Sequence, residues 1–301
     1  MDDQSPVQFI ACGTADEFLD SLSPRGKYFV GEHDSDSYVF RGHGDQRYQL
    51  LPTALRFGKC IYTSTGWRKV GDWTNEIQIR AELSTIERFF GLADLTGLPL
   101  PEDSQALRDS LFDLQFLDGD LRDWPPQNLL SLIALAQHYG IPTRLLDWFR
   151  NAFIAAYFAA IEAAKWGVEQ ESSGVERLAV WAFKAIGYDL NRIASYKHRN
   201  RLEKIRMISV ITAPEASNTD LHAQRGVFTL CRSVADSLEA PAHREPMDEV
   251  VKNLSAQDDI HNNLIEFSLP ISESPSYCIF SLARMLMQQP CFRVITESRE
   301  L

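Results

Sequence analysis

Two strongly apolar segments lie close together in the middle of this chain and restrict how it can fold. They are LLSLIALA at 129–136 and AFIAAYFAAI at 152–161. A helix that is apolar on nearly every face belongs inside a protein, because on the surface it would expose that apolar area to water. Two prolines precede the first segment and Gly140 follows it, as is typical of helix boundaries. We therefore predict buried, central helices over 127–139 and 151–165.

The connection between these two helices carries polar and aromatic side chains that are costly to bury. A short connection held at both ends would place such side chains rigidly, as a binding site requires. We select seven candidates from it: Gln137, His138, Tyr139, Thr143, Arg144, Asp147 and Trp148. A structural interpretation stays open, with an Arg144–Asp147 ion pair and Trp148 in the core. In that interpretation His138 would bond to a carbonyl at the helix end.

Two further stretches carry candidate residues beside expected strands. Phe40-Arg41-Gly42 follows a strand expected at 37–40. An arginine there can hold a phosphate or carboxylate in a planar fork, and a glycine permits close approach of a ligand. The alternative is an ion-paired arginine beside a turn. The third candidate is Gln224, in HAQRGVFTLC at 222–231. The alternative for this stretch is the start of a strand with a glycine bulge.

The remaining periodicities predict helices first and strands later, which indicates an α+β fold rather than regular alternation. The expected helices are at 14–22, 75–92, 104–116 and 275–288, and the expected strands at 178–183, 207–212, 226–231 and 263–269. We predict one domain over 1–301, with helices packed on a mostly antiparallel sheet. Its core would cover about 20–270, followed by a helical extension at 271–301.

The formal net charge of -11 argues against general adhesion to nucleic acid or to anionic membranes. A polyanion would have to meet a local basic patch. The run KHRNRLEKIR at 197–206 is such a patch, and we predict that it contacts a nucleic-acid or protein acceptor. A solvated helix face is the alternative.

The five cysteines are scattered and form no CxxC pair, which favours a reducing compartment. The N-terminus lacks the layout of a signal peptide, and the longest apolar runs, about ten residues, are too short for a bilayer span of roughly 20. We therefore predict a cytoplasmic protein without a membrane segment. No Cys/His spacing suits zinc, so no metal site is expected, and the common phosphate-loop and hydrolase motifs are absent.

Three stretches together resemble the FRG domain, a family named after a Phe-Arg-Gly tripeptide. They are YVFRGHGDQRYQLLPTALR, the QHYGIPTRLLD segment at 137–147, and AQRGVFTL with its Gln-x-Gly-x-Phe pattern at 224–228. The resemblance covers roughly 20–270. It implies a role in bacterial stress or phage defence, for example as a toxin, with an antitoxin or regulatory partner.

The order of these stretches is also similar, more distantly, to the ADP-ribosyltransferase fold. In that fold a strand arginine holds NAD, and a polar turn precedes a helix of the pattern Val-Ala-x-x-Phe-Ala, which IAAYFA at 154–159 resembles. The likeness implies NAD as a substrate. It implies catalytic roles for Asp147, Gln224 and His138, and NAD-binding roles for Arg41, Gly42, Gln137, Tyr139, Thr143, Arg144 and Trp148.

Two positions depart from the ADP-ribosyltransferase pattern. The usual Ser-Thr-Ser turn is replaced by residues 147–149, and the usual catalytic glutamate by Gln224. Asp147 would then supply the negative charge that stabilises the transition state. Without that charge, the domain would be a nucleotide- or ligand-sensing module. A nuclease with His138 as general base is a third hypothesis.

Overall fold

The computed structural model describes residues 7–29, 37–112, 124–169, 174–185, 207–212, 227–232, 237–258 and 264–273. Three predictions fall outside these residues: the helix at 275–288, the basic run at 197–206, and the placement of Gln224.

The larger sheet has four strands in the order β1-β9-β6-β2. β1 (Val7–Ala11) runs parallel to β9 (Leu264–Pro270), whereas the pairs β9–β6 (Arg177–Lys184) and β6–β2 (Tyr38–His43) are antiparallel. Almost every position of β6 and β9 is buried. Continuous burial of this kind explains why the sequences of these two strands are nearly unbroken apolar runs.

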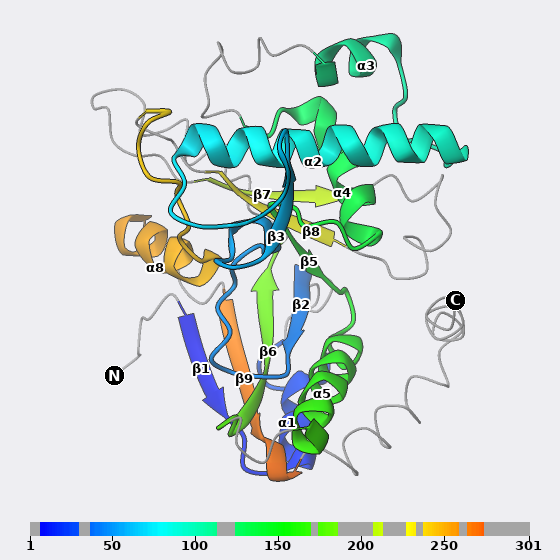
Figure 1. The fold of residues 1–301 in the computed structure, drawn as a ribbon. Helices are drawn as coiled ribbons and strands as arrows, with labels where there is room; N and C mark the ends of the chain where they lie inside the picture. The colour runs from blue at the N-terminus through cyan, green and yellow to red at the C-terminus, as the bar shows by residue number, and fades with distance from the viewer. Residues whose placement is uncertain are drawn as a thin grey trace.

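A second sheet contains β5 (Leu145–Trp148), β8 (Val227–Arg232) and β7 (Met207–Thr212), in that order and all antiparallel. It meets the larger sheet where Phe40 and Phe149 exchange two backbone hydrogen bonds, each 2.7 Å from N to O. β2 and β5 therefore lie side by side in the centre of the molecule (Figure 1). The prediction that 145–148 is part of a connection was wrong, because these residues form the edge strand of this sheet.

Helices α1 (Ala15–Leu22) and α5 (Ala152–Glu169) pack on the larger sheet. The Thr14 hydroxyl accepts a hydrogen bond from the Glu17 amide and caps α1, as its sequence spacing predicted. The buried side of α5 is lined by alanines, so this helix lies close against β2 and β6. The predicted central helix at 151–165 is thus confirmed.

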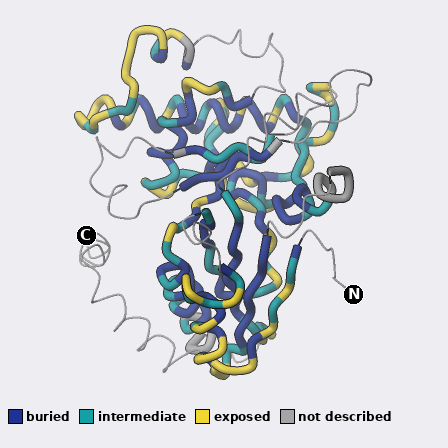
Figure 2. The backbone as a smooth tube through the Cα atoms, turned by 180° about the vertical axis from the view of Figure 1, so that it is seen from behind, coloured by how far each residue is buried: buried dark blue, intermediate teal, exposed yellow. Residues whose placement is uncertain are grey.

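The second sheet is covered by α2 (Asn75–Thr96), α3 (Gln105–Phe112) and α4 (Leu130–His138), which share one apolar cluster with β5, β7 and β8. A short 3-10 turn, η5 (Gln127–Leu129), precedes α4. Each sheet therefore has its own apolar cluster, and a third cluster joins side chains of both sheets and of α8 (Met247–Asp258). Figure 2 shows the buried residues in dark blue along both sheets. The helices predicted at 75–92, 104–116 and 127–139 are confirmed, although α2 is longer and α4 is shorter than expected; α3 is described as far as Phe112.

The rest of the described chain consists of short elements. They are the hairpin β3 (Cys60–Thr63) with β4 (Gly66–Lys69), the helix α8 (Met247–Asp258), and the 3-10 turns η2 (Thr53–Leu55) and η7 (Ile271–Glu273). The fold is mixed α+β as predicted. The expected separation of helices from strands was wrong, because β1 to β4 precede α2, and α8 lies between β8 and β9. Among the described helices, none has both the length and the apolar character needed to cross a bilayer.

Candidate ligand-binding site where the two sheets meet

The centre of the candidate site is an ion pair between β2 and β5. The Arg41 Nη1 atom lies 2.6 Å from Asp147 Oδ1 and also donates to the Asp147 backbone oxygen at 2.8 Å. These residues are 106 positions apart in the chain. The junction at Phe40 and Phe149 brings them together, because it sets the neighbouring positions of β2 and β5 beside each other.

Gln137 in the last turn of α4 and Thr143 in the connection after this helix extend the pair. Gln137 Nε2 donates to Asp147 Oδ1 at 3.1 Å, and the Thr143 hydroxyl donates to Gln137 Oε1. The Thr143 hydroxyl in turn accepts from the Leu145 amide at 3.2 Å. Of the seven candidates predicted from the connection, three are therefore joined in one hydrogen-bonded network: Gln137, Thr143 and Asp147.

His43 holds the other side of the Arg41 guanidinium and was missed by the sequence analysis. Its Nε2 accepts from Arg41 Nε at 3.0 Å, so its proton lies on Nδ1, which donates to the Tyr48 carbonyl at 3.2 Å. Burial, followed by the positive charge of Arg41, lowers the pKa of His43 from 6.5 to about 3. His43 is therefore neutral at physiological pH and orients Arg41. The signal was its i, i+2 spacing from Arg41 on one strand.

The buried, neutral state of His43 predicts a pH dependence of stability. The unfolded chain protonates this histidine below about pH 6.5, whereas the folded chain resists protonation until about pH 3. Between these values the unfolded state binds more protons, so the free energy of unfolding should fall as pH falls, by about 1.4 kcal/mol per pH unit. The comparison is urea unfolding of the wild type and His43→Gln between pH 7 and pH 5. Parallel pH profiles would contradict the prediction.

Arg56 brings a second guanidinium toward Arg41. Its Nε donates to the Leu51 carbonyl at 2.8 Å, and it makes no ion pair with any described residue. Burial, and then the positive charge of Arg41, lower the pKa of Arg56. The Nη2 of Arg41 and the terminal nitrogens of Arg56 donate to none of the described residues. These unused donors are suited to an anionic ligand such as a phosphate.

Two carboxylates lie beside these guanidiniums. Glu162 of α5 accepts from the Gly44 amide at 2.8 Å, and its negative charge offsets part of the lowering of the Arg56 pKa by burial and by Arg41. Burial raises the pKa of Asp147, but the Arg41 guanidinium more than offsets this, so the pKa lies below its ordinary value and Asp147 is ionised.

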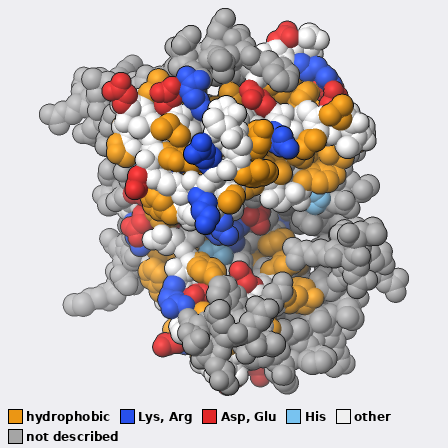
Figure 3. All heavy atoms as spheres, in the orientation of Figure 1, with side chains coloured by type: hydrophobic (Ala, Val, Ile, Leu, Met, Phe, Trp, Pro, Cys, Tyr) orange, Lys and Arg blue, Asp and Glu red, His pale blue; other side chains and the backbone are white. Residues whose placement is uncertain are grey.

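The side chain of Asp147 is 51% accessible to solvent and that of Arg41 is 14% accessible. The Asp147 carboxylate is therefore accessible to a ligand, whereas most of the Arg41 side chain is covered by protein. Figure 3 shows basic and histidine side chains gathered, with acidic atoms beside them, in the hollow across the middle of this face. We call the group Arg41, His43, Arg56, Gln137 and Asp147 the recess.

Residues 36–166 match the model of the FRG domain family. The chain contains an FRG domain. The matched segment is narrower than the predicted 20–270, but it includes every residue of the recess together with Glu162. No curated protein and no solved structure matches the chain.

The glycine of the FRG tripeptide is explained by packing rather than by ligand approach. A Cβ atom at Gly42 would overlap the Ala155 carbonyl oxygen and lie 3.0 Å from the Ala159 nitrogen. Gly42 therefore lets the backbone of α5 lie directly on β2. This packing accounts for the glycine, and the role of Gly42 in cofactor binding stays a prediction.

Two other predicted site residues of the FRG domain lie in the core. The Arg144 guanidinium forms two hydrogen bonds of 2.9 Å with the Glu82 carboxylate, and both side chains are buried. Trp148 is 1% exposed, and its Nε1 donates to the Thr229 hydroxyl at 2.8 Å. Neighbouring residues of a strand face opposite sides, so Trp148 is turned inward where Asp147 is turned outward. Neither residue is accessible to a ligand, which corrects both predictions.

His138 and Tyr139 lie at the end of α4 without a contact to the recess. Their rings are 5.6 Å apart, and the half-exposed Tyr139 ring packs 5.9 Å from Phe89 of α2. The His138 side chain makes no hydrogen bond with any described residue, so the alternative in which it bonds to a carbonyl at the helix end is not observed either. In the part of the chain that the structure describes, no group of three or more His, Cys, Asp or Glu side chains is arranged for a metal ion.

Proposed function

We propose that the recess binds NAD and that this FRG domain is an ADP-ribosyltransferase-like effector. The observation that carries the proposal is the pairing of Arg41 with Asp147 at an accessible position where the two sheets meet. The fixed guanidinium complements the anionic pyrophosphate of NAD. The ionised carboxylate beside it complements the positive charge that the ribose gains during transfer.

The roles of the recess residues follow from their free atoms. Arg41 Nη2 and Arg56 would bind the pyrophosphate oxygens, since Arg forms strong charge-assisted bonds with phosphate. The Asp147 carboxylate would stabilise the positive charge that develops on the ribose as the bond to nicotinamide breaks. Nicotinamide leaves with the bonding electrons, and an acceptor nucleophile forms the new bond to the ribose and loses a proton. His43 and Gln137 are positioning residues, because they hold Arg41 and Asp147.

The test is transfer of label from NAD, labelled in its adenylate phosphate, to components of a cell extract, together with nicotinamide release. We expect the wild type to transfer label. In both Arg41→Ala and Asp147→Asn the rate of transfer should fall at least about tenfold. Arg25→Ala is the matched control, because Arg25 is exposed and lies outside the recess. No transfer and no nicotinamide release by the wild type would count against the enzyme.

A nucleotide-sensing module without chemistry is the second candidate. It is favoured by the hydrogen bonds of Asp147, whose Oδ1 already accepts from both Arg41 and Gln137. Ligand binding to the folded state raises the thermal unfolding midpoint. This module would be identified if NAD or another nucleotide raises the unfolding midpoint without release of nicotinamide. The increase in the midpoint should disappear in Arg41→Ala. The nuclease hypothesis has less support, since His138 lies apart from the recess.

The cellular context remains part of the proposal. A toxin or phage-defence role, a cytoplasmic location, a nucleic-acid or protein acceptor at 197–206, and an antitoxin or regulatory partner are all proposed on the FRG resemblance and the sequence. Deletion of the charges in the basic run should then reduce label transfer to the acceptor while leaving nicotinamide release unchanged.

A further inference from the structure

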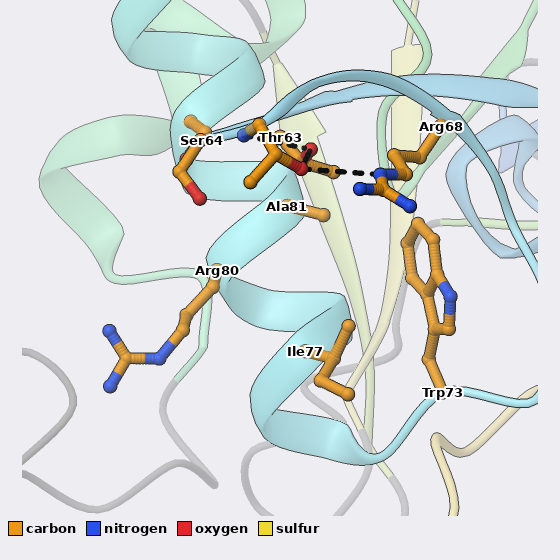
Figure 4. Close-up of a pocket in the computed structure, with 9 residues that line it drawn as sticks. Thr63, Ser64, Arg68, Trp73, Ile77, Arg80 and Ala81 are labelled. Carbon is orange, nitrogen blue, oxygen red and sulfur yellow. Dashed lines mark hydrogen bonds between the residues drawn. The ribbon is translucent and has the colours of Figure 1, made fainter.

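A second pocket, separate from the recess, lies between the β3–β4 hairpin and α2 (Figure 4). Its volume is about 320 Å³. Its wall includes two arginines, an indole and several hydroxyl groups, among them Thr63, Thr65, Arg68, Trp73, Arg80 and Ser84. None of these residues belongs to the recess, so the pocket requires its own explanation.

The charge of this pocket is positive and only partly compensated. Arg68 is exposed, its Nε donates to the Thr65 hydroxyl at 3.2 Å, and it makes no ion pair with any described residue. Arg80 pairs with Glu76 at 2.8 Å, but the two side chains are 48% and 38% exposed. An exposed pair of this kind contributes little and exchanges readily with another anion. Both guanidiniums are thus available to a ligand.

The apolar part of the pocket is formed by Trp73 and Ile77. Trp73 packs against a small buried cluster and is therefore held in place, while Ile77 is 47% exposed. Figure 4 shows the Arg68 guanidinium beside the Trp73 indole, whereas the Arg80 side chain extends from α2 away from this pair. An aromatic ring beside an arginine offers a stacking platform for a base and a cation for its phosphate, and the exposed Arg80 adds a second positive charge at the rim.

We propose that this pocket binds one nucleotide unit of a single-stranded nucleic acid. The base lies against Trp73 and Ile77, and the phosphates before and after it meet Arg68 and Arg80. The volume, at the low end of the roughly 300–1,000 Å³ of ligand pockets, suits a single unit and not a dinucleotide. Because the chain carries a formal net charge of -11, such binding depends on this local positive charge. The inference holds whether or not the recess transfers ADP-ribose.

The test is fluorescence anisotropy with a labelled single-stranded oligonucleotide of about eight nucleotides, the middle of the usual site sizes. We expect Arg68→Ala and Arg80→Ala each to weaken binding about threefold to tenfold. Each variant should also reduce the slope of log affinity against log salt concentration by about one. Glu76→Gln should tighten binding about twofold, because it releases Arg80. Both arginines are exposed, so these variants keep the fold, which the thermal midpoint verifies.

Arg25→Ala and Arg41→Ala are the controls, and neither should change the affinity for the oligonucleotide. Three results would overturn the proposal: no binding by the wild type, unchanged affinity in both pocket variants, or loss of binding in Arg41→Ala, which would move the site to the recess. Competition with uridine monophosphate tests whether the pocket prefers a free nucleotide or a nucleotide within a strand. Equal affinity of the free nucleotide and the strand would overturn the assignment to a strand.

Discussion

Glu82→Ala is expected to lower the free energy of unfolding by about 3–5 kcal/mol, because it leaves the buried Arg144 guanidinium without its carboxylate. Glu82 also accepts from Trp124 Nε1 at 2.9 Å and from Gln78 Nε2 at 2.7 Å. One carboxylate therefore ties α2 to the start of β5 and to the segment before η5. Chemical denaturation at neutral pH measures the change.

Glu76→Ala is the matched control. It also removes a carboxylate from α2, but the ion pair of Glu76 with Arg80 is exposed. Its effect should stay within about 1 kcal/mol. Replacing both Glu82 and Arg144 by leucine should be far less damaging than Glu82→Ala alone, because no buried charge then lacks a partner. Equal losses in Glu82→Ala and Glu76→Ala would show that the buried pair does not hold these elements together.

Gly42→Ala is expected to destabilise the protein by about 3 kcal/mol or more. The added Cβ would overlap the backbone of α5 at Ala155, and a backbone cannot rotate away as a side chain can. Either α5 moves off β2 or β2 shifts, and a shift of β2 displaces Arg41 from Asp147. Thermal unfolding measures the first effect, and ligand binding to the recess measures the second.

Gly91→Ala is the matched control for the glycine variant. No atom lies within 4 Å of a Cβ at Gly91, which lies inside α2. Alanine has the higher helix propensity, so this change should be neutral or stabilising by up to about 1 kcal/mol. If Gly42→Ala were as stable as Gly91→Ala, the close packing of α5 on β2 would not be the reason for the glycine in the FRG tripeptide.

The helices were predictable because their signals are local. The cap at Thr14, the apolar run of α4 and the alanine-rich α5 each lie within a single stretch of sequence. Strand β5 was not predictable, because its four residues lie between two helices and become a strand only by pairing with β8, whose partner residues lie about 80 positions later. Interpreting 145–148 as a connection then made Trp148 and Asp147 equally good site candidates.

The same non-local pairing explains which recess residues were missed. His43 and Arg56 were present in the FRG motif, but the only signal was the i, i+2 spacing of His43 from Arg41, and only the tertiary structure shows that both surround Arg41. Arg144 shows the opposite error. It stands three positions before Asp147, and only the position of Glu82 on α2 reveals that it is a buried ion-pair partner.

The amino-acid sequence by itself determined the likeness of 36–166 to the FRG domain, the α+β class and the places of the central helices, since these depend on patterns within short windows. The tertiary structure alone decided which polar side chains form the recess and which lie in the core. The physical reason is the junction of two sheets at Phe40 and Phe149, where a pair of backbone hydrogen bonds unites Arg41 and Asp147 across 106 positions.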